Sequence, residues 1–214
     1  MKSIHLLSAL FLLWLSLPLQ AQNSSSDCPP EGRAREGKGE LKEELKEMNR
    51  KKNRDASEPD AEPVRLTFDQ FQQGRTKTDD HHQWEEGQYV ELSGAYLIDF
   101  KQQKGESCNC YEADTNKAMG DIHINLGTKA DMDEGNNNHY MIVEITPTYK
   151  AQHPNVMDEL KALEGKEVLV RGYLFYDHEH ERNSINYCKK CSDRGVWRKS
   201  CWEVHPVTFI GAKE

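Results

Sequence analysis

The stretch Gly120–Thr146, GDIHINLGTKADMDEGNNNHYMIVEIT, alternates apolar and polar residues near both of its ends. A period of two is typical of β-strands that turn one face to a core and the other face away from it. The stretch therefore predicts two neighbouring strands at the centre of a β-barrel, joined by a polar loop. The apolar positions are Ile122, Ile124, Leu126, Met141, Val143 and Ile145.

Three further segments are predicted as strands, over residues 87–103, 167–177 and 201–211. Gly94 and Gly172 mark bends in the first two, and Pro206 indicates an edge or a bulge in the last. A helix is expected over residues 155–166, with Asn155 as its N-cap and Gly165 at its C-terminal end. A short helix is expected in residues 66–74, with Thr67 as its cap.

This order of elements predicts a mainly β domain: a five-stranded OB-fold-like Greek-key barrel with one helix between strands 3 and 4. An open α+β sheet is the alternative, because periodicity defines strands better than it defines closure.

The chain divides into three parts by composition. Residues 1–21 carry one cation, Lys2, then an apolar run and a small-residue cleavage signal at Ala21, the pattern of a signal peptide. The apolar run is short for a transmembrane anchor, which is the alternative. Residues 22–62 hold few large apolar side chains and are predicted as a disordered charged linker with a transient helix, or a partner-binding helix, near residues 40–48. Residues 63–214 form the predicted barrel domain.

The formal charge is −8, and removal of Lys2 with the signal peptide makes it −9. An acidic exported protein does not favour nucleic acid, whose phosphates need a basic surface. The late loop nevertheless holds cations that could form a local basic patch, Lys189, Lys190, Arg194, Arg198 and Lys199.

Six cysteines in an exported chain indicate disulfides, and six cysteines allow 15 pairings. Cys108 and Cys110 are too close in sequence to bridge each other without strain, so either both have partners elsewhere or one of them stays reduced. Cys188-x-x-Cys191 with Cys201 resembles half of a zinc ribbon, but a disulfide-stapled loop is the preferred interpretation. The disulfide candidates are Cys108, Cys110, Cys188, Cys191 and Cys201.

The polar faces of the predicted strands carry the candidate site. In an OB barrel, His123, Glu144 and either Glu203 or His205 would share one outward face. Two histidines and a carboxylate form a common metal ligand set, so a divalent ion held by His123, Glu144 and His205 is possible. The alternative is that these side chains simply face water.

The run DHEHER, residues 177–182, lacks the His-Glu-x-x-His spacing of zinc proteases. Asp177 and His180 are therefore predicted at the margin of the same face, or in a solvated turn.

The blocks DIHINL (121–126), VEITP (143–147), VRGYLFYDHEH (170–180) and WEVHPVTFI (202–210) resemble those of bacterial exported OB-fold-like proteins of unassigned function. The resemblance implies the fold and an exported location, and it supplies no catalytic residues.

Three functions are compatible with these patterns. The first is an exported, periplasmic or extracellular OB-fold module that binds an unidentified ligand. The second is a metal-dependent hydrolase or nuclease-like enzyme, although no nucleophile with an orienting partner is recognisable. The third is a single-stranded nucleic-acid binder.

Overall fold

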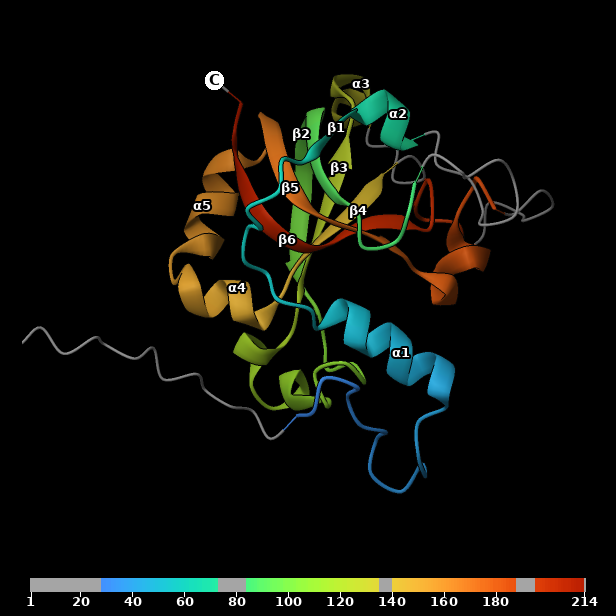
Figure 1. Cartoon of the computed structure of the whole chain (residues 1–214). Helices are drawn as coiled ribbons and strands as arrows, with labels where there is room; N and C mark the ends of the chain where they lie inside the picture. The colour runs from blue at the N-terminus through green and yellow to red at the C-terminus, as the bar shows by residue number, and fades with distance from the viewer. Residues whose placement is uncertain (1–27, 73–83, 135–139, 188–194, 214) are drawn as a thin grey trace, which may run out of the picture.

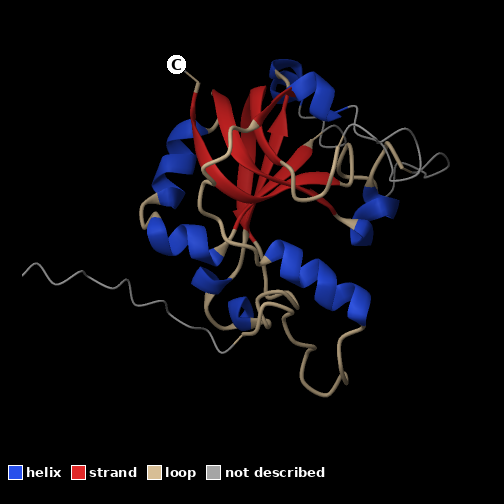
Figure 2. Ribbon diagram, in the orientation of Figure 1, coloured by secondary structure: helices blue, strands red, loops and turns tan. Residues whose placement is uncertain are grey.

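The computed structural model describes residues 28–72, 84–134, 140–187 and 195–213. Five strands form a closed barrel in the order β2-β3-β4-β6-β5, and β5 pairs again with β2 to close it (Figure 2). Of the five pairings around the barrel, only that of β4 with β6 is parallel. The predicted OB-fold-like barrel is therefore confirmed. The strands are β2 Tyr89–Gln102, β3 Ile122–Gly127, β4 Met141–Ile145, β5 Glu167–Tyr176 and β6 Trp202–Ala212.

The predicted apolar positions fill the core of the barrel. All six apolar positions of the central stretch are buried, together with Leu97 of β2 and Val170 of β5. Full burial of an aliphatic side chain contributes about 1.5–3 kcal/mol. At one edge of this core, the rings of Tyr176 and Trp202 meet edge to face, with centroids 5.2 Å apart.

Both predicted glycine bends lie at irregularities of the sheet. Gly94 has φ +80°, and the β2–β5 register shifts between Leu92 and Ala95 around it. Gly172 packs so closely on β6 that an added Cβ would lie 2.4 Å from the carbonyl oxygen of Pro206. The β5–β6 register shifts at Gly172, so Pro206 lies in a bulge of an interior strand and not at a sheet edge.

The predicted helix between the third and fourth barrel strands is α5, Val156–Leu163, and Gly165 follows it with φ +76°. A second helix, α4 Pro147–Gln152, precedes α5. The short helix α2, Phe68–Gln72, begins at a capping box in which Gln70 N–H donates to Thr67 Oγ1 and Thr67 N–H donates to Gln70 Oε1. The remaining short helices are α3 Lys129–Glu134, η1 Glu112–Asp114, η2 Lys117–Met119 and η4 His178–Asn183.

A sixth strand, β1 Val64–Thr67, was not expected from the pattern. It runs parallel to residues 90–93 of β2, a part of that strand that β3 does not reach. Only Leu66 of its four residues is buried. A single buried position gives no alternating pattern in the sequence. The strand forms because it pairs with β2.

The segment predicted as a disordered linker contains an ordered helix in its described part, residues 28–62. This helix is α1, Glu43–Lys52, and Met48, Asn49 and Lys52 on it are buried. Figure 1 shows α1 beside the loop that joins β2 to β3, at the end of the barrel opposite α2 and α3.

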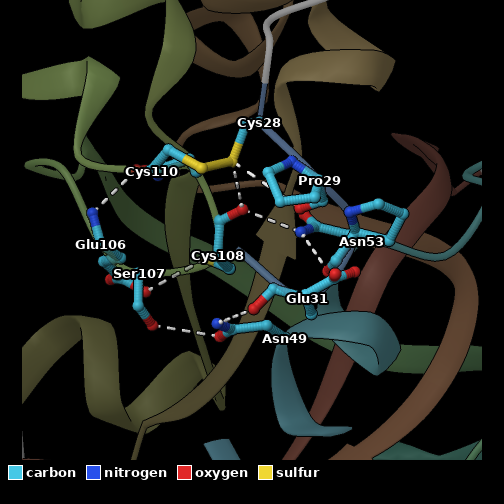
Figure 3. Close-up of a disulfide and its surroundings, with 11 residues drawn as sticks. Cys28, Pro29, Glu31, Asn49, Asn53, Glu106, Ser107, Cys108 and Cys110 are labelled. Carbon is cyan, nitrogen blue, oxygen red and sulfur yellow. Dashed lines mark hydrogen bonds between the residues drawn. A yellow bond between two sulfur atoms is a disulfide. The ribbon is translucent and has the colours of Figure 1, made fainter. Parts of the chain in front are cut away.

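A disulfide and polar contacts hold this segment against the loop. Cys28 is bridged to Cys110, 82 residues away. Asn53 Nδ2 donates to the carbonyl oxygen of Pro30 (2.9 Å) and to that of Cys108 (2.8 Å), and Figure 3 shows the contact with Cys108. The segment is predicted as disordered because it has few large apolar side chains. In the structure a disulfide and side-chain amide hydrogen bonds hold it in place instead of apolar packing. We name residues 28–62 the N-terminal arm.

No helix within the described ranges is long and apolar enough to cross a membrane. The predicted signal peptide, residues 1–21, lies outside those ranges and stays a prediction.

Candidate functional site

Three strands bring His123, Glu144 and His205 together. His123 of β3 pairs directly with Glu144 of β4, and β6 lies on the other side of β4. His123 Nε2 lies 2.5 Å from Glu144 Oε1, and His205 Nδ1 lies 3.0 Å from Glu144 Oε2. The Glu144 carboxylate is thus placed between two imidazoles.

The predicted exposure of this face is wrong, because the face is buried. Glu144 and His205 are each 1% exposed, and His123 is 8% exposed. Glu203 and Asp177, also predicted on or near the outward face, are likewise buried. The N-terminal arm and the β2–β3 loop contribute buried side chains to the same cluster, which the barrel pattern alone could not reveal.

Burial and pairing set the charges of Glu144 and His205. Burial works to raise the pKa of Glu144, but His123 and His205 outweigh it and hold the pKa well below its usual range. Burial works to lower the pKa of His205, but the Glu144 carboxylate outweighs it and raises the pKa to about 10.

Asp121 belongs to the same cluster and was not among the predicted site residues. One ligand atom each from Asp121, Glu144 and His205 lies within 4.8 Å of the others, and all three residues are buried. Burial raises the pKa of Asp121 to about 6, His205 opposes this rise, and the Glu144 carboxylate adds to it. The sequence does contain a signal for Asp121: it lies two residues before His123, so both are expected on the same, polar face of the strand.

Several polar atoms of this cluster have no hydrogen bond of good geometry within the described part of the chain. They are His123 Nε2, Glu144 Oε2, and both ring nitrogens of His205. His123 Nε2, Glu144 Oε2 and His205 Nδ1 lie in the ion pairs described above, but the directions of those contacts leave capacity for a further partner.

Arg198 forms a second, adjacent group of buried charges. Its Nη1 lies 2.6 Å from Glu203 Oε1 and 3.6 Å from Asp177 Oδ2. Arg198 is fully buried, so it cannot join the predicted basic surface patch. Lys189, Lys190 and Arg194 lie outside the described ranges.

Asp177 also holds the imidazole of His180. Its Oδ2 lies 2.5 Å from His180 Nδ1, and its Oδ1 accepts a hydrogen bond from Glu179 N–H. Burial works to raise the pKa of Asp177, but the hydrogen bond from His180 and the charge of Lys52 hold it well below its usual range. The structure thus places Asp177 inside the charged cluster and not at its margin, whereas His180 is partly exposed beside it.

The N-terminal arm adds Lys52 to the cluster. Lys52 is 4% exposed, and its Nζ lies 3.3 Å from Oε2 of Glu106 in the β2–β3 loop. Burial works to lower the pKa of Lys52, but the nearby acids, led by Glu106 and then Glu144, outweigh it and raise the pKa. Neither residue was predicted, because both belong to segments without periodicity.

A disulfide is present within the described ranges, as the cysteine content predicts. Cys110 has a distant partner as expected, but that partner is Cys28, which was not among the candidates (Figure 3). Cys108 and Cys201 are free and buried, and Cys201 Sγ lies 3.2 Å from Ser184 Oγ. Cys188 and Cys191 lie outside the described ranges.

A groove of about 810 Å³ lies between α1 and the end of β5. Its wall includes Leu45 and Met48 of α1, Tyr111 of the β2–β3 loop, and Phe175 of β5. None of Asp121, Glu144 and His205 lines it, so the groove is separate from the buried cluster.

Comparisons with known proteins found no match: no protein-family model, curated protein or solved structure matches this chain. The candidate function therefore rests on the chemistry of the cluster.

Proposed function

We propose that this chain is an exported OB-fold-like binding module whose ligand is a divalent metal ion held by Asp121, Glu144 and His205. The observation that carries the proposal is the convergence of three potential ligand atoms within 4.8 Å in the buried layer. Ligand atoms that are each about 2 Å from one zinc ion lie at most about 4 Å apart. Small side-chain rotations would therefore bring all three to one ion.

The contact between Glu144 and His205 supports a shared ion. The two side chains are 3.0 Å apart, yet neither Glu144 Oε2 nor a nitrogen of His205 has a well-directed hydrogen bond among the described residues. Two ligands of one ion approach each other closely without pointing at each other. A metal ion would use a lone pair of Glu144 and would replace one of the two ring protons that His205 carries beside this carboxylate.

His123 would then act as a positioning residue. Its Nε2 contacts the Glu144 oxygen that faces away from His205. Partners of this kind orient a coordinating group and commonly change metal affinity by about 10–100-fold. The ligand set expected from the sequence, His123, Glu144 and His205, is thereby revised: Asp121 takes the place of His123.

Burial favours a binding role over catalysis. A hydrolytic metal centre keeps an open position for water and substrate, whereas a closed site holds its ion with protein ligands. Asp121, Glu144 and His205 are at most 3% exposed. An ion there would link β4 and β6 with Asp121, the residue that ends the β2–β3 loop.

An exported location is part of the proposal. The Cys28–Cys110 bridge is of the kind that persists in oxidising compartments. The predicted signal peptide and the resemblance to exported OB-fold-like proteins fit the same location.

Equilibrium dialysis of the metal-free full chain against Zn²⁺ and Mn²⁺ tests the proposal. One ion should bind per chain, and Asp121→Asn should abolish binding because it removes an anionic ligand. Asp177→Asn is the matched control: Asp177 is an equally buried aspartate with His180 and Arg198 as partners. The control should unfold more easily yet keep one ion per chain. Equal binding by Asp121→Asn and the wild type would refute the proposal.

A metal-dependent hydrolase is the second candidate, and the Asp177–His180 pair favours it. A buried carboxylate on one ring nitrogen orients an imidazole, as in general-base catalysis. His180 is partly exposed, so it could reach a substrate. Zinc-dependent hydrolysis of a phosphodiester or ester probe that is lost in His180→Gln, with zinc binding retained, would establish this function.

A further inference from the structure

The sulfur of Cys108 lies at the edge of the buried cluster. Cys108 Sγ is 3.7 Å from Glu106 Oε2 and 4.0 Å from Asp121 Oδ2. A thiol has one proton and can donate it to one acceptor at a time. The sulfur therefore faces two carboxylate oxygens and can satisfy only one of them.

Asp121 joins this sulfur to the proposed metal ligands. Glu106, Cys108 and Asp121 form one group of converging ligand atoms, and Asp121, Glu144 and His205 form the other. In addition, His205 is almost fully buried and both of its ring nitrogens lack a well-directed hydrogen bond among the described residues. The two groups share the Asp121 carboxylate, so a movement of the Cys108 side chain toward Glu144 and His205 would bring its sulfur to an ion held beside Asp121.

We infer that Cys108 supplies a thiolate to this ion, which makes the centre a four-ligand site of Cys108, Asp121, Glu144 and His205. The inference rests on the proposed function. When the ion binds, the bond from sulfur to hydrogen breaks and one N–H bond of the His205 imidazolium breaks. Both protons pass to solvent, and the freed sulfur and nitrogen lone pairs form bonds to the metal. No oxidant or reductant is needed.

Glu106 is better assigned as the partner of Lys52 than as a fifth ligand. Its Oε2 lies 3.3 Å from Lys52 Nζ, so an ammonium group already neutralises it. Four ligands of sulfur, nitrogen and oxygen suit the tetrahedral preference of Zn²⁺. Mg²⁺ and Ca²⁺ prefer oxygen ligands alone, so the thiolate selects against them.

The covalent structure of the loop keeps Cys108 available as a thiol. Its neighbour Cys110 is bonded to Cys28, and Cys108 itself is buried. Two hydrogen bonds to backbone carbonyls hold the loop at Cys108 and at the residue before it: Arg33 N–H donates to Ser107 O (3.0 Å), and Asn53 Nδ2 donates to Cys108 O (2.8 Å). Figure 3 shows Cys108 between the bridge and Asn53.

Cobalt is the probe that separates this inference from the proposed function, because Co²⁺ bound to a thiolate absorbs in the near ultraviolet by charge transfer. The full chain, with its disulfide intact and metals removed, is titrated with Co²⁺. The key variant carries Cys188→Ser, Cys191→Ser and Cys201→Ser. Of the six cysteines it retains only Cys108 outside the Cys28–Cys110 bridge.

Both the wild type and this triple variant should show the charge-transfer band at one Co²⁺ per chain. Cys108→Ser should lose the band and bind Co²⁺ at least about tenfold more weakly. Cobalt binding by the triple variant without the band would overturn the thiolate and leave the proposed function standing. No cobalt binding by the wild type would overturn both. The triple variant retains Cys108, so the test does not depend on whether Cys108→Ser folds.

Discussion

Lys52 Nζ of α1 lies 3.3 Å from Glu106 Oε2 of the β2–β3 loop, so the N-terminal arm places a buried ammonium group against the acidic cluster. The ammonium group and the proposed metal ion are both positively charged. Lys52 stabilises the cluster in the absence of an ion and opposes the binding of one.

Lys52→Met should therefore have two opposite effects. In the metal-free protein it should lower the free energy of unfolding by about 1–2 kcal/mol. This is less than for a fully buried pair, because the Glu106 side chain is one-third exposed. At the same time it should increase zinc affinity, since a repelling charge is removed. Urea unfolding with and without Zn²⁺ measures both effects.

Lys51→Met is the matched control, because Lys51 lies on the same helix and pairs with Glu86 at 2.9 Å. Its zinc affinity should equal that of the wild type. If zinc fails to restore the stability of Lys52→Met, the cluster is an ion-pair network and not a metal site.

The Cys28–Cys110 bridge should stabilise the whole described fold and not only the arm. A bridge that spans 82 residues constrains the unfolded chain by about 4–5 kcal/mol in the loop-entropy description. Replacement of both cysteines by serine should lower the free energy of unfolding by up to this amount, measured in urea. A reducing agent should destabilise the wild type similarly and leave the double variant unchanged. An unchanged midpoint in both would show that the arm does not contribute to the fold.

The Asp177–His180 pair should make stability depend on pH in a defined direction. Burial works to lower the pKa of His180, but Asp177 raises it above the ordinary value of 6.5. A raised pKa in the folded state gives stability that is fully present below pH 6.5 and is lost as pH rises through the folded pKa. The lowered pKa of Asp177 gives stability that is lost as pH falls below about 4.

His180→Gln should therefore lower the free energy of unfolding most between about pH 4 and pH 6.5. This loss of stability should be smaller at pH 9. The control is His178→Gln, an exposed neighbour whose Nδ1 is 3.5 Å from Glu181. A cost for His180→Gln that is the same at pH 5.5 and pH 9 would contradict the paired, protonated imidazole.

Arg198 should be essential for folding and irrelevant to nucleic-acid binding. Removal of one partner of a buried ion pair costs about 3–5 kcal/mol, and Arg198→Met leaves both Glu203 and Asp177 without this cation. Thermal melting measures the loss. Retention on a single-stranded DNA column is the second measurement, with Asp177→Asn as a similarly destabilised control. If Arg198→Met lowers the retention of the protein and Asp177→Asn does not, Arg198 contributes to nucleic-acid binding and this assignment is wrong.

The barrel was predictable because period-two alternation defines strands and their faces. The same alternation placed His123, Glu144 and His205 on the polar side of their strands, where the structure brings them together. The alternation could not show that the polar side of these strands is buried. Polar residues at every second position are expected both on a face in contact with water and on a face covered by other polar groups.

The missing parts of the site come from segments without periodicity. Lys52, Glu106 and Cys108 lie in an arm and a loop whose positions depend on a disulfide and on single hydrogen bonds. Cys28 belongs to a segment whose composition indicates disorder, so the sequence gives no sign that it pairs with Cys110. Polar contacts between residues that are distant in sequence produce no local sequence pattern, so they could not be predicted.

Anomalous scattering from crystals of the metal-free full chain soaked in Zn²⁺ tests the metal centre most directly. One strong peak is expected, with ligand atoms of Asp121, Glu144 and His205 at about 2.0–2.2 Å and the sulfur of Cys108 at about 2.3 Å. Crystals in which zinc is found only on surface histidines or carboxylates, with no peak in the cluster, would show that these residues do not hold a metal ion.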